Sequence, residues 1–267
     1  MRLLRGILAL SVVLAPAVAS AQNVLFYTTD AAEYTKMVST ATTNGWSLTQ
    51  WTPGDGTKSA SQLSAYDALV VGWSGGTSDF SGILNSQAGI TAARGSRTFL
   101  TGQDADYHQT YGGCASCAQR FITNAVDWAA AGSGLGIVGL SDYAGAWMTN
   151  SSSFLYSELI NNVAYGRSGD NVVIPGSSAG YPVNAGLTSA DLSNWGSSYH
   201  MQFRSVTSGY TTINTTPDFT DGFNAVTILT ESEAAGGTTS APEPASMVLM
   251  ATGLVGIVGF ARRKRNA

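Results

Sequence analysis

The sequence predicts an α/β layer fold, with a largely parallel sheet and helices on both faces. Two observations carry this prediction. Apolar runs such as residues 23–28 and 67–73 lack strict alternation of polar and apolar residues, so both faces of these strands are expected to be covered. Helical stretches lie between such runs, and strands that alternate with helices indicate parallel pairing through crossover connections.

The amino-terminal half supplies the first predicted elements. Residues 23–28 form a compact run of strand-favouring residues. Asp30 precedes a predicted helix at 31–43, where Met37 and Ala41 lie one turn apart, and Asn44-Gly45 ends it. Further strands are predicted at 46–51, 67–73 and 98–101.

The carboxy-terminal half continues the alternation. A helix is predicted at 118–131, because Phe121, Ile122 and Ala125 fall on or near one face. A glycine-rich strand at 134–140 and a helix at 153–164 follow. Short strands are predicted at 172–174, 200–203 and 225–229.

This order of elements resembles the flavodoxin-like fold of class I glutamine amidotransferase-like domains. Residues 181–187 (YPVNAGL) resemble the His-Pro-Val-x-x-Gly-Leu turn of amidotransferase-like domains of the trehalose-utilisation type, with Tyr181 where His is usual. In such a fold, ligands bind at the carboxyl ends of the parallel strands. Three strand ends are therefore of interest, at residues 28–30, 73–76 and 101–104.

The catalytic residues of the amidotransferases are missing. Residues 102–106 (GQDAD) occupy the place of the Gly-x-Cys-x-Gly nucleophile turn, with Asp104 at the nucleophile position. The His-x-Glu pair is absent, since the nearest candidate reads His200-Met201-Gln202. An amidotransferase needs a thiolate that a His activates. The resemblance therefore implies a catalytically degenerate domain without that activity.

Asp104, Asp106, His108 and His200 remain as weak candidates for chemistry. An extended loop would point Asp104, Asp106 and His108 the same way, and such a set suits a divalent metal. The alternative is a solvated acidic loop, and we predict neither a resident metal nor a cofactor. His200 lies on a strand-like run and fits a packed core histidine as well as a site residue.

Cys114 and Cys117 are the only cysteines. In an exported protein a disulfide between them is the simplest interpretation, and its small loop gives a modest stabilisation. A redox activity is the alternative, because the helix that follows would lower the pKa of a thiol. No further cysteine exists to complete a zinc site.

Aromatic residues are frequent near the predicted loops. They include Trp46, Trp51, Trp73, Tyr107, Tyr111, Tyr143, Trp147, Trp195 and Tyr199. Aromatic faces surrounded by Asn, Ser and Thr suit sugar rings, which suggests binding of a matrix polysaccharide. The alternative is that these side chains fill the core.

The amino terminus is predicted to be a signal peptide at residues 1–21. Arg2 and Arg5 precede a short apolar run, and Ala19-Ser20-Ala21 provides the small residues before a cleavage site. An uncleaved anchor is the alternative, but the apolar run is much shorter than the ~20 residues that a membrane span needs.

The carboxy terminus has three parts in a fixed order: Pro242-Glu243-Pro244, an apolar run at 245–261, and the basic cluster Arg262-Arg263-Lys264-Arg265. A helix over 245–261 would reach roughly 25 Å, which makes a short membrane span, and positive flanks stay cytoplasmic. This order resembles the PEP-CTERM signal of Gram-negative bacteria.

The resemblance implies a sorting tail at 242–267, joined through a small, polar linker at 231–241 to an α/β domain at 22–230. It also implies transient insertion into the inner membrane, cleavage by an exosortase-type enzyme, and release of the body to the cell surface or extracellular matrix. The tail then serves as a temporary anchor.

The body is more acidic than the whole chain. Of the 13 Lys and Arg residues, two lie in the predicted signal peptide and four in the tail, whereas only one of the 17 Asp and Glu residues lies in either. The body therefore carries 7 basic and 16 acidic residues, a net charge of −9. This balance argues against nucleic acid and anionic lipid as partners, because both need clustered basic residues.

The hypothesis that follows is a surface- or matrix-sorted protein whose body acts in binding or in matrix structure. An extracellular hydrolase on a glycan or peptide, using Asp and His residues at the strand ends, is the alternative. A structural component with no ligand site is a third possibility. The sequence leans against an enzyme without excluding one.

Overall fold

The computed structural model describes residues 21–73, 79–143, 145–204 and 209–231. Residues 21–234 form one compact unit. The predicted signal peptide up to Ser20, the linker beyond Glu231 and the sorting tail lie outside the described residues. Within the described ranges, no helix is long and apolar enough for a membrane crossing.

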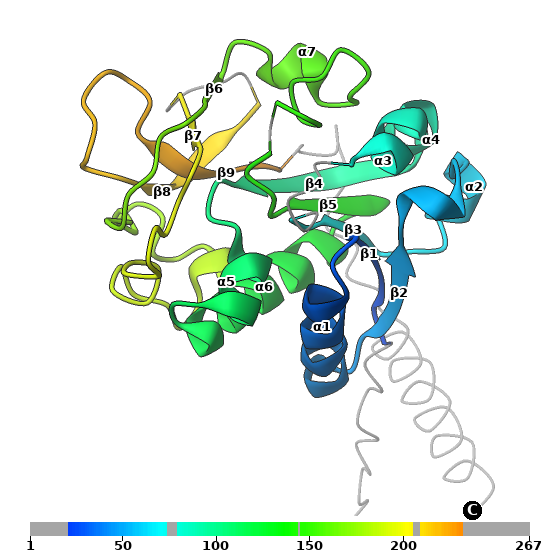
Figure 1. Cartoon of the computed structure of the whole chain (residues 1–267), viewed down its shortest axis with the longest axis horizontal. Helices are drawn as coiled ribbons and strands as arrows, with labels where there is room; N and C mark the ends of the chain where they lie inside the picture. Colours follow the sequence, from blue (N-terminus) through cyan, green and yellow to red (C-terminus); the bar gives the residue numbers. More distant parts are fainter. Residues whose placement is uncertain (1–20, 74–78, 144, 205–208, 232–267) are drawn as a thin grey trace, which may run out of the picture. The chain divides into compact units, whose positions relative to one another are not determined.

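A single mixed sheet organises this unit (Figure 1). In the described chain its order is β2-β1-β3-β5-β4-β9-β7-β6, and β8 pairs with β9. The five parallel strands are β1 (Asn23–Tyr27), β2 (Ser47–Trp51), β3 (Ala68–Val71), β4 (Arg94–Thr101) and β5 (Leu135–Gly139). An antiparallel extension adds β6 (Val163–Ala164), β7 (Gln202–Phe203), β8 (Thr211–Thr215) and β9 (Ala225–Glu231). The largely parallel α/β fold is therefore confirmed.

The strand order differs from the flavodoxin-like order 2-1-3-4-5. Strand β5 lies between β3 and β4, so the last two parallel strands are exchanged. The connection from β3 to β4 passes one strand position, through α3 (Ser81–Asn85) and α4 (Gln87–Ala93), and the chain then turns back to form β5. The sequence alternation does not specify which neighbour a strand takes, so this exchange could not be read from it.

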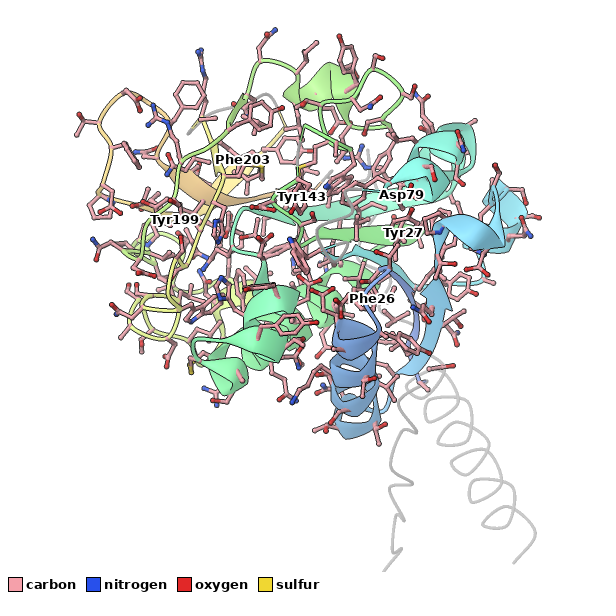
Figure 2. All side chains as sticks on the ribbon, viewed as in Figure 1. Phe26, Tyr27, Asp79, Tyr143, Tyr199 and Phe203 are labelled. Carbon is pink, nitrogen blue, oxygen red and sulfur yellow. A yellow bond between two sulfur atoms is a disulfide. The ribbon has the colours of Figure 1, made fainter. Side chains whose placement is uncertain are left out.

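Helices cover both faces of the sheet, as predicted (Figure 1). One face carries α1 (Ala31–Asn44), α5 (Ala105–Tyr111) and α6 (Ala115–Ala130). The other carries α2 (Ala60–Leu63), α3, α4 and the segment around α7 (Tyr156–Leu159). Neighbouring residues of a strand serve different cores: Phe26 packs with the first group of helices and Tyr27 with the second (Figure 2).

Helix α1 begins and ends at the residues that the sequence indicated. The Asp30 side chain accepts hydrogen bonds from the backbone N–H groups of Ala32 and Glu33, which satisfies donors that the helix itself leaves free. Gly45 ends the helix at φ 73°, a conformation that favours glycine. Glu33, Met37 and Thr40 form part of the buried face.

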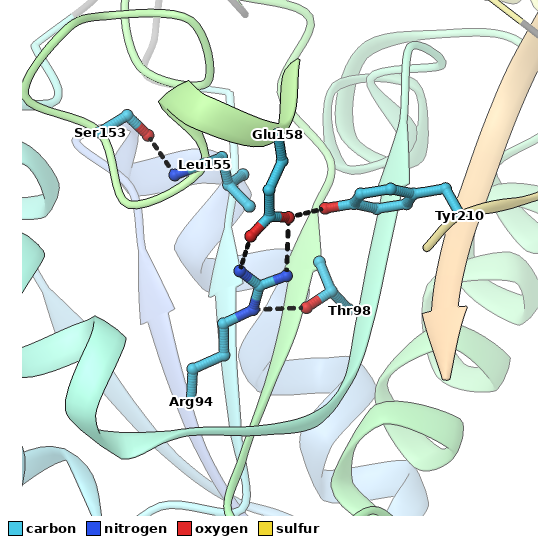
Figure 3. Close-up of polar contacts among 6 residues, drawn as sticks. All are labelled: Arg94, Thr98, Ser153, Leu155, Glu158 and Tyr210. Carbon is cyan, nitrogen blue, oxygen red and sulfur yellow. Dashed lines mark hydrogen bonds and ion pairs between the residues drawn. The ribbon is translucent and has the colours of Figure 1, made fainter. Parts of the chain in front are cut away.

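Two predictions between residues 153 and 174 were wrong. The expected helix at 153–164 is only the single turn α7 followed by strand β6. The tertiary structure fixes this segment, because Arg94 on β4 binds Glu158 of α7 through two N–H donors (Figure 3). The expected strand at 172–174 is reduced to one bridge, between Val173 and Thr215.

Candidate functional site

Four polar or aromatic residues follow the carboxyl ends of the central parallel strands. Thr28 follows β1, Trp73 follows β3, Asp104 follows β4 and Asp142 follows β5. The connection from β1 runs to one side of the sheet and the connection from β3 to the other. Ligands of open α/β sheets bind outside the strand ends at such a switch point, so this edge is the candidate site.

Asp104 occupies a strand–turn–helix junction between β4 and α5. Its φ is 41°, which is rare outside glycine, and its side chain is 3% exposed. The backbone N–H of Asp142 donates a 2.6 Å hydrogen bond to Oδ1 of Asp104. Burial and the charge of the neighbouring Asp142 raise the pKa of Asp104. Burial also raises the pKa of Asp142, and two adjacent carboxyl groups disfavour ionisation of both.

Glu33, in the first turn of α1 after β1, and Asp106, in α5 after β4, form a second carboxyl pair. Oε2 of Glu33 accepts a hydrogen bond from the Thr28 hydroxyl at 3.0 Å, and Oδ2 of Asp106 accepts one from the Trp73 N–H at 2.7 Å. Both side chains are 1% exposed. Burial raises the pKa of each, and the charge of Asp106 adds to the rise at Glu33.

His108 and His200 lie together on another side of α5. Their rings are stacked 6.2 Å apart, and the His108 ring is 5.3 Å from that of Trp195. Burial is the main cause that lowers the pKa of His108 to about 4. The backbone N–H of His200 donates to the Gly102 carbonyl at 2.9 Å, which fixes its strand segment to the end of β4.

The predicted extended run from Asp104 to His108 is wrong, because residues 105–111 form helix α5. Residues two apart on a helix point to widely different directions, at ~100° per residue. Asp106 accordingly contacts Trp73, whereas His108 contacts Trp195 and His200. In the described ranges no group of three or more His, Cys, Asp and Glu is arranged to hold a metal ion. The hypothesis of one metal site on Asp104, Asp106 and His108 therefore fails.

A cleft of about 440 Å³ opens beside the first carboxyl pair. Asp142 and His200 lie in its wall, and Tyr143 and Tyr165 provide aromatic surface. Ser168 adds a hydroxyl group. Asp142 also lies close enough to His200 for the histidine to lower the carboxyl pKa, although burial dominates and the net direction is upward.

Partly exposed aromatic rings gather above the strand ends. We call Trp73, Tyr107, Tyr111 and Tyr143 the aromatic rim. Around Trp73, the ring centroids of the other three lie at 5.0, 6.5 and 6.3 Å. The Tyr111 side chain is 49% exposed, and its hydroxyl donates to both carboxylate oxygens of Asp30.

The remaining aromatics of the sequence hypothesis are buried. Their exposed fractions are at most 8%, for Trp46, Trp51, Trp147, Trp195 and Tyr199. These side chains fill the two cores, as the alternative interpretation held. Of the aromatic residues in the sequence hypothesis, those of the aromatic rim are the ones that remain partly exposed in the described chain.

A second cleft lies toward the amino ends of β4 and β5. Its volume is about 720 Å³, and Arg97, Asp127, Trp128 and Tyr181 contribute to its lining. Tyr181 begins the turn on which the amidotransferase resemblance rested, and the first cleft's wall does not include it. That turn therefore adds nothing to the candidate site.

The predicted disulfide is confirmed. Cys114 and Cys117 are bonded, and Cys114 is the residue before the first turn of α6. The bond closes a loop with a sequence separation of 3. Such a short loop constrains the unfolded chain only modestly.

Sequence reasoning missed Glu33 and Asp142. Asp142 follows a predicted buried strand, so the rule that ligands meet strand ends already contained the signal. Glu33 lies four residues before Met37, on the apolar face of the predicted helix. An acidic residue at a buried helical position is unusual, and that spacing was the available signal.

Comparison with protein families matches residues 240–265 to the PEP-CTERM protein-sorting motif. The prediction of a PEP-CTERM sorting motif is thus confirmed, and the motif indicates an exported, cell-surface-directed protein that exosortase processes. No curated protein and no solved structure matches the chain. The amidotransferase-like interpretation of the body has no support from these comparisons.

Proposed function

We propose that this chain, which carries a PEP-CTERM sorting motif, places a carbohydrate-binding domain at the cell surface or in the extracellular matrix. The aromatic rim above the strand ends is the observation that carries the proposal. Sugar rings stack their C–H faces on aromatic rings, and nearby carboxylates and hydroxyls accept or donate hydrogen bonds to sugar hydroxyls.

The arrangement of groups supports a polyhydroxylated ligand. The ring centroids of Trp73 and Tyr143 lie 6.3 Å apart with an interplanar angle of 30°, which brings two aromatic rings within reach of one ligand. Tyr143 also lies in the wall of the cleft that contains Asp142 and His200. The rim thus leads from exposed aromatic surface to charged and hydrogen-bonding groups, which are the two parts of a sugar site.

Retention on immobilised polysaccharides tests the proposal. The full-length chain is expected to bind at least one matrix polysaccharide, and Trp73→Ala or Tyr143→Ala is expected to weaken binding by roughly two- to tenfold. Tyr181→Ala is the matched control, because Tyr181 is a partly buried tyrosine of the other cleft. Absence of retention on every polysaccharide, or equal loss in the control, contradicts the proposal.

Hydrolysis is a second candidate function, which the Asp104–Asp142 pair supports. Asp142 lies in the cleft wall beside His200, and burial raises the pKa of its carboxyl group. A carboxyl group with a raised pKa suits proton transfer to or from a reacting group. In this mechanism Asp142 takes a proton from the attacking water as the water oxygen bonds to the attacked carbon. Asp142 then returns the proton to the leaving oxygen or nitrogen as the bond to that atom breaks.

Product release distinguishes hydrolysis from binding alone. New reducing ends from glycans, or new amines from peptides, are expected with the wild-type chain and not with Asp142→Asn. Asp127→Asn is the control, since Asp127 lies in the other cleft. Binding without product formation retains the first proposal and removes the second.

We also propose that the tail is removed, so that the 245–261 segment anchors the chain only transiently. The support is the match to the sorting motif at residues 240–265. Mass spectrometry of surface material is expected to find a carboxy terminus near Pro242. A surface protein that retains Arg265 contradicts this proposal.

A further inference from the structure

The pair formed by Glu33 and Asp106 has features that carbohydrate binding does not explain. Both side chains are 1% exposed and lie at the switch point between β1 and β3. Oε1 of Glu33 and Oδ1 of Asp106 have no hydrogen-bond partner among the described residues. Buried polar atoms are almost always satisfied, and an unsatisfied one needs an explanation such as an ion.

Among the described residues, no basic side chain pairs with either carboxyl. Neither Glu33 nor Asp106 forms an ion pair with Lys or Arg in the described part of the chain. Burial is the main cause that raises the pKa of Glu33. The groups that also act on this pKa are Asp106, Thr28, Asp30 and Asp104, and none of them is cationic. Two buried carboxylates without a counter-charge are strongly unfavourable.

The two carboxyl pairs at this edge differ in how they meet. In the first pair, the backbone N–H of Asp142 donates to Oδ1 of Asp104. No backbone or side-chain hydrogen bond between Glu33 and Asp106 is found among the described residues, and Asp106 raises the pKa of Glu33 through its charge. Each carboxyl of this second pair keeps one buried oxygen without a hydrogen-bond partner in the described chain.

We propose that Glu33 and Asp106 bind one divalent cation of the Ca²⁺ or Mg²⁺ class through Oε1 and Oδ1. Two carboxylates balance a charge of +2, and oxygen-only donor sets select these hard cations. The Thr28 hydroxyl and the Trp73 carbonyl, which are hydrogen-bonded to each other at 3.0 Å, add neutral oxygens next to the pair.

The cation would link three strand-end segments. Glu33 belongs to the first turn of α1, Asp106 to α5, and Trp73 follows β3. Because the other oxygen of Asp106 holds the Trp73 N–H, the ion would also steady the base of the aromatic rim. The inference does not depend on carbohydrate binding and stands or fails separately.

Equilibrium dialysis and thermal melts of the full-length chain test the site. EDTA-treated protein is expected to bind about one Ca²⁺ or Mg²⁺ per chain at this site and to melt at a higher temperature when the ion is added, since a ligand that binds the folded state stabilises it. Glu33→Gln and Asp106→Asn are expected to abolish both effects. Asp127→Asn, a carboxyl of the other cleft, is the control and should keep both.

The variants remain informative about folding. Without metal, both are expected to melt at or above the wild-type temperature, because each removes charge repulsion, and Asp106→Asn keeps an oxygen for the Trp73 N–H. The inference is overturned if the wild type shows no saturable binding at millimolar Ca²⁺ or Mg²⁺ and no change with EDTA. It is also overturned if both variants still bind one ion.

Discussion

The backbone N–H of Asp142 donates to Oδ1 of Asp104 across 2.6 Å, and this bond joins the carboxyl ends of β5 and β4. The two residues are 38 positions apart in the chain, yet their strands are neighbours in the sheet. The contact places the buried carboxyl of Asp104 beside Asp142, which lies in the wall of a cleft. The pKa of Asp104 therefore depends on whether Asp142 is charged.

Asp104→Asn is expected to stabilise the protein at pH 7. Its folded pKa is raised above the unfolded value of about 3.9, so the folded state binds the proton more tightly. This contribution is fully present below about pH 4 and is lost as pH rises toward the folded pKa. The amide removes the charge and keeps an acceptor for Asp142, with an expected gain on the order of 1 kcal/mol.

Melts between pH 3 and 8 check this prediction, with Asp170→Asn as the contrast. Backbone and hydroxyl donors of Ser197 and Ser198 lower the pKa of Asp170, so its contribution is present above its unfolded pKa and is lost in acid. Asp170→Asn should therefore lower the Tm at pH 7. A Tm difference between wild type and Asp104→Asn that does not change with pH would contradict the prediction.

His108 is expected to stay neutral down to about pH 4. Burial disfavours its charged form, although the carbonyls of Ser197 and Trp195 and the charge of Asp170 partly offset this effect. The unfolded pKa is about 6.5, so stability is lost as pH falls from about 6.5 toward 4. NMR titration of the two imidazole rings measures the value directly, and a His108 midpoint at or above 6.5 would show the prediction to be wrong.

Gly72→Ala is expected to destabilise the protein by about 1–3 kcal/mol, as overpacking of a core does. A Cβ atom at this position would lie closer than 3.0 Å to Oδ2 of Asp106 and to the Phe26 ring. The alanine therefore disturbs both a core and the Asp106–Trp73 hydrogen bond. Gly176→Ala is the control, since nothing lies within 4 Å of its Cβ position; urea unfolding of both variants provides the comparison.

Arg94→Met is expected to lower stability by about 1–3 kcal/mol, less than a fully buried pair would, because the side chains of Arg94 and Glu158 are 16% and 32% exposed. The guanidinium binds both oxygens of Glu158 and the Thr98 hydroxyl, and the Tyr210 hydroxyl binds the same carboxylate (Figure 3). A double-mutant cycle with Glu158→Gln measures the coupling. Additive effects of the two changes would show that the pair contributes nothing of its own.

Local patterns predicted those elements whose signals are complete within a few residues. Asp30 and Gly45 bound α1 because capping chemistry is local, and the apolar runs became buried strands because their composition suits two covered faces. The segment at 153–164 failed for the opposite reason. Its conformation depends on Arg94, about sixty residues earlier, which no local pattern reports.

The residues of the candidate site also differ in whether local sequence patterns could predict them. The sequence placed Asp104 and His200 near strand ends, and the structure brings both to the carboxyl edge of the sheet. The structure separates Asp106 from His108, because both lie on helix α5, where side chains two residues apart point in different directions. Glu33 on α1 and Asp142 after β5 also belong to the site. Their places in it could be recognised only once the order of the strands was known.

By itself, the sequence determined the sorting motif, the acidic body, the cysteine pairing and the α/β class, since each is written in contiguous residues or in composition. Only the tertiary structure decided that β5 lies beside β4, so that Asp142 meets Asp104. It also decided that Asp106 of α5 lies near enough to Glu33 of α1 to raise its pKa. Electrostatic energies between carboxyl groups depend on distance and burial, and folding sets both.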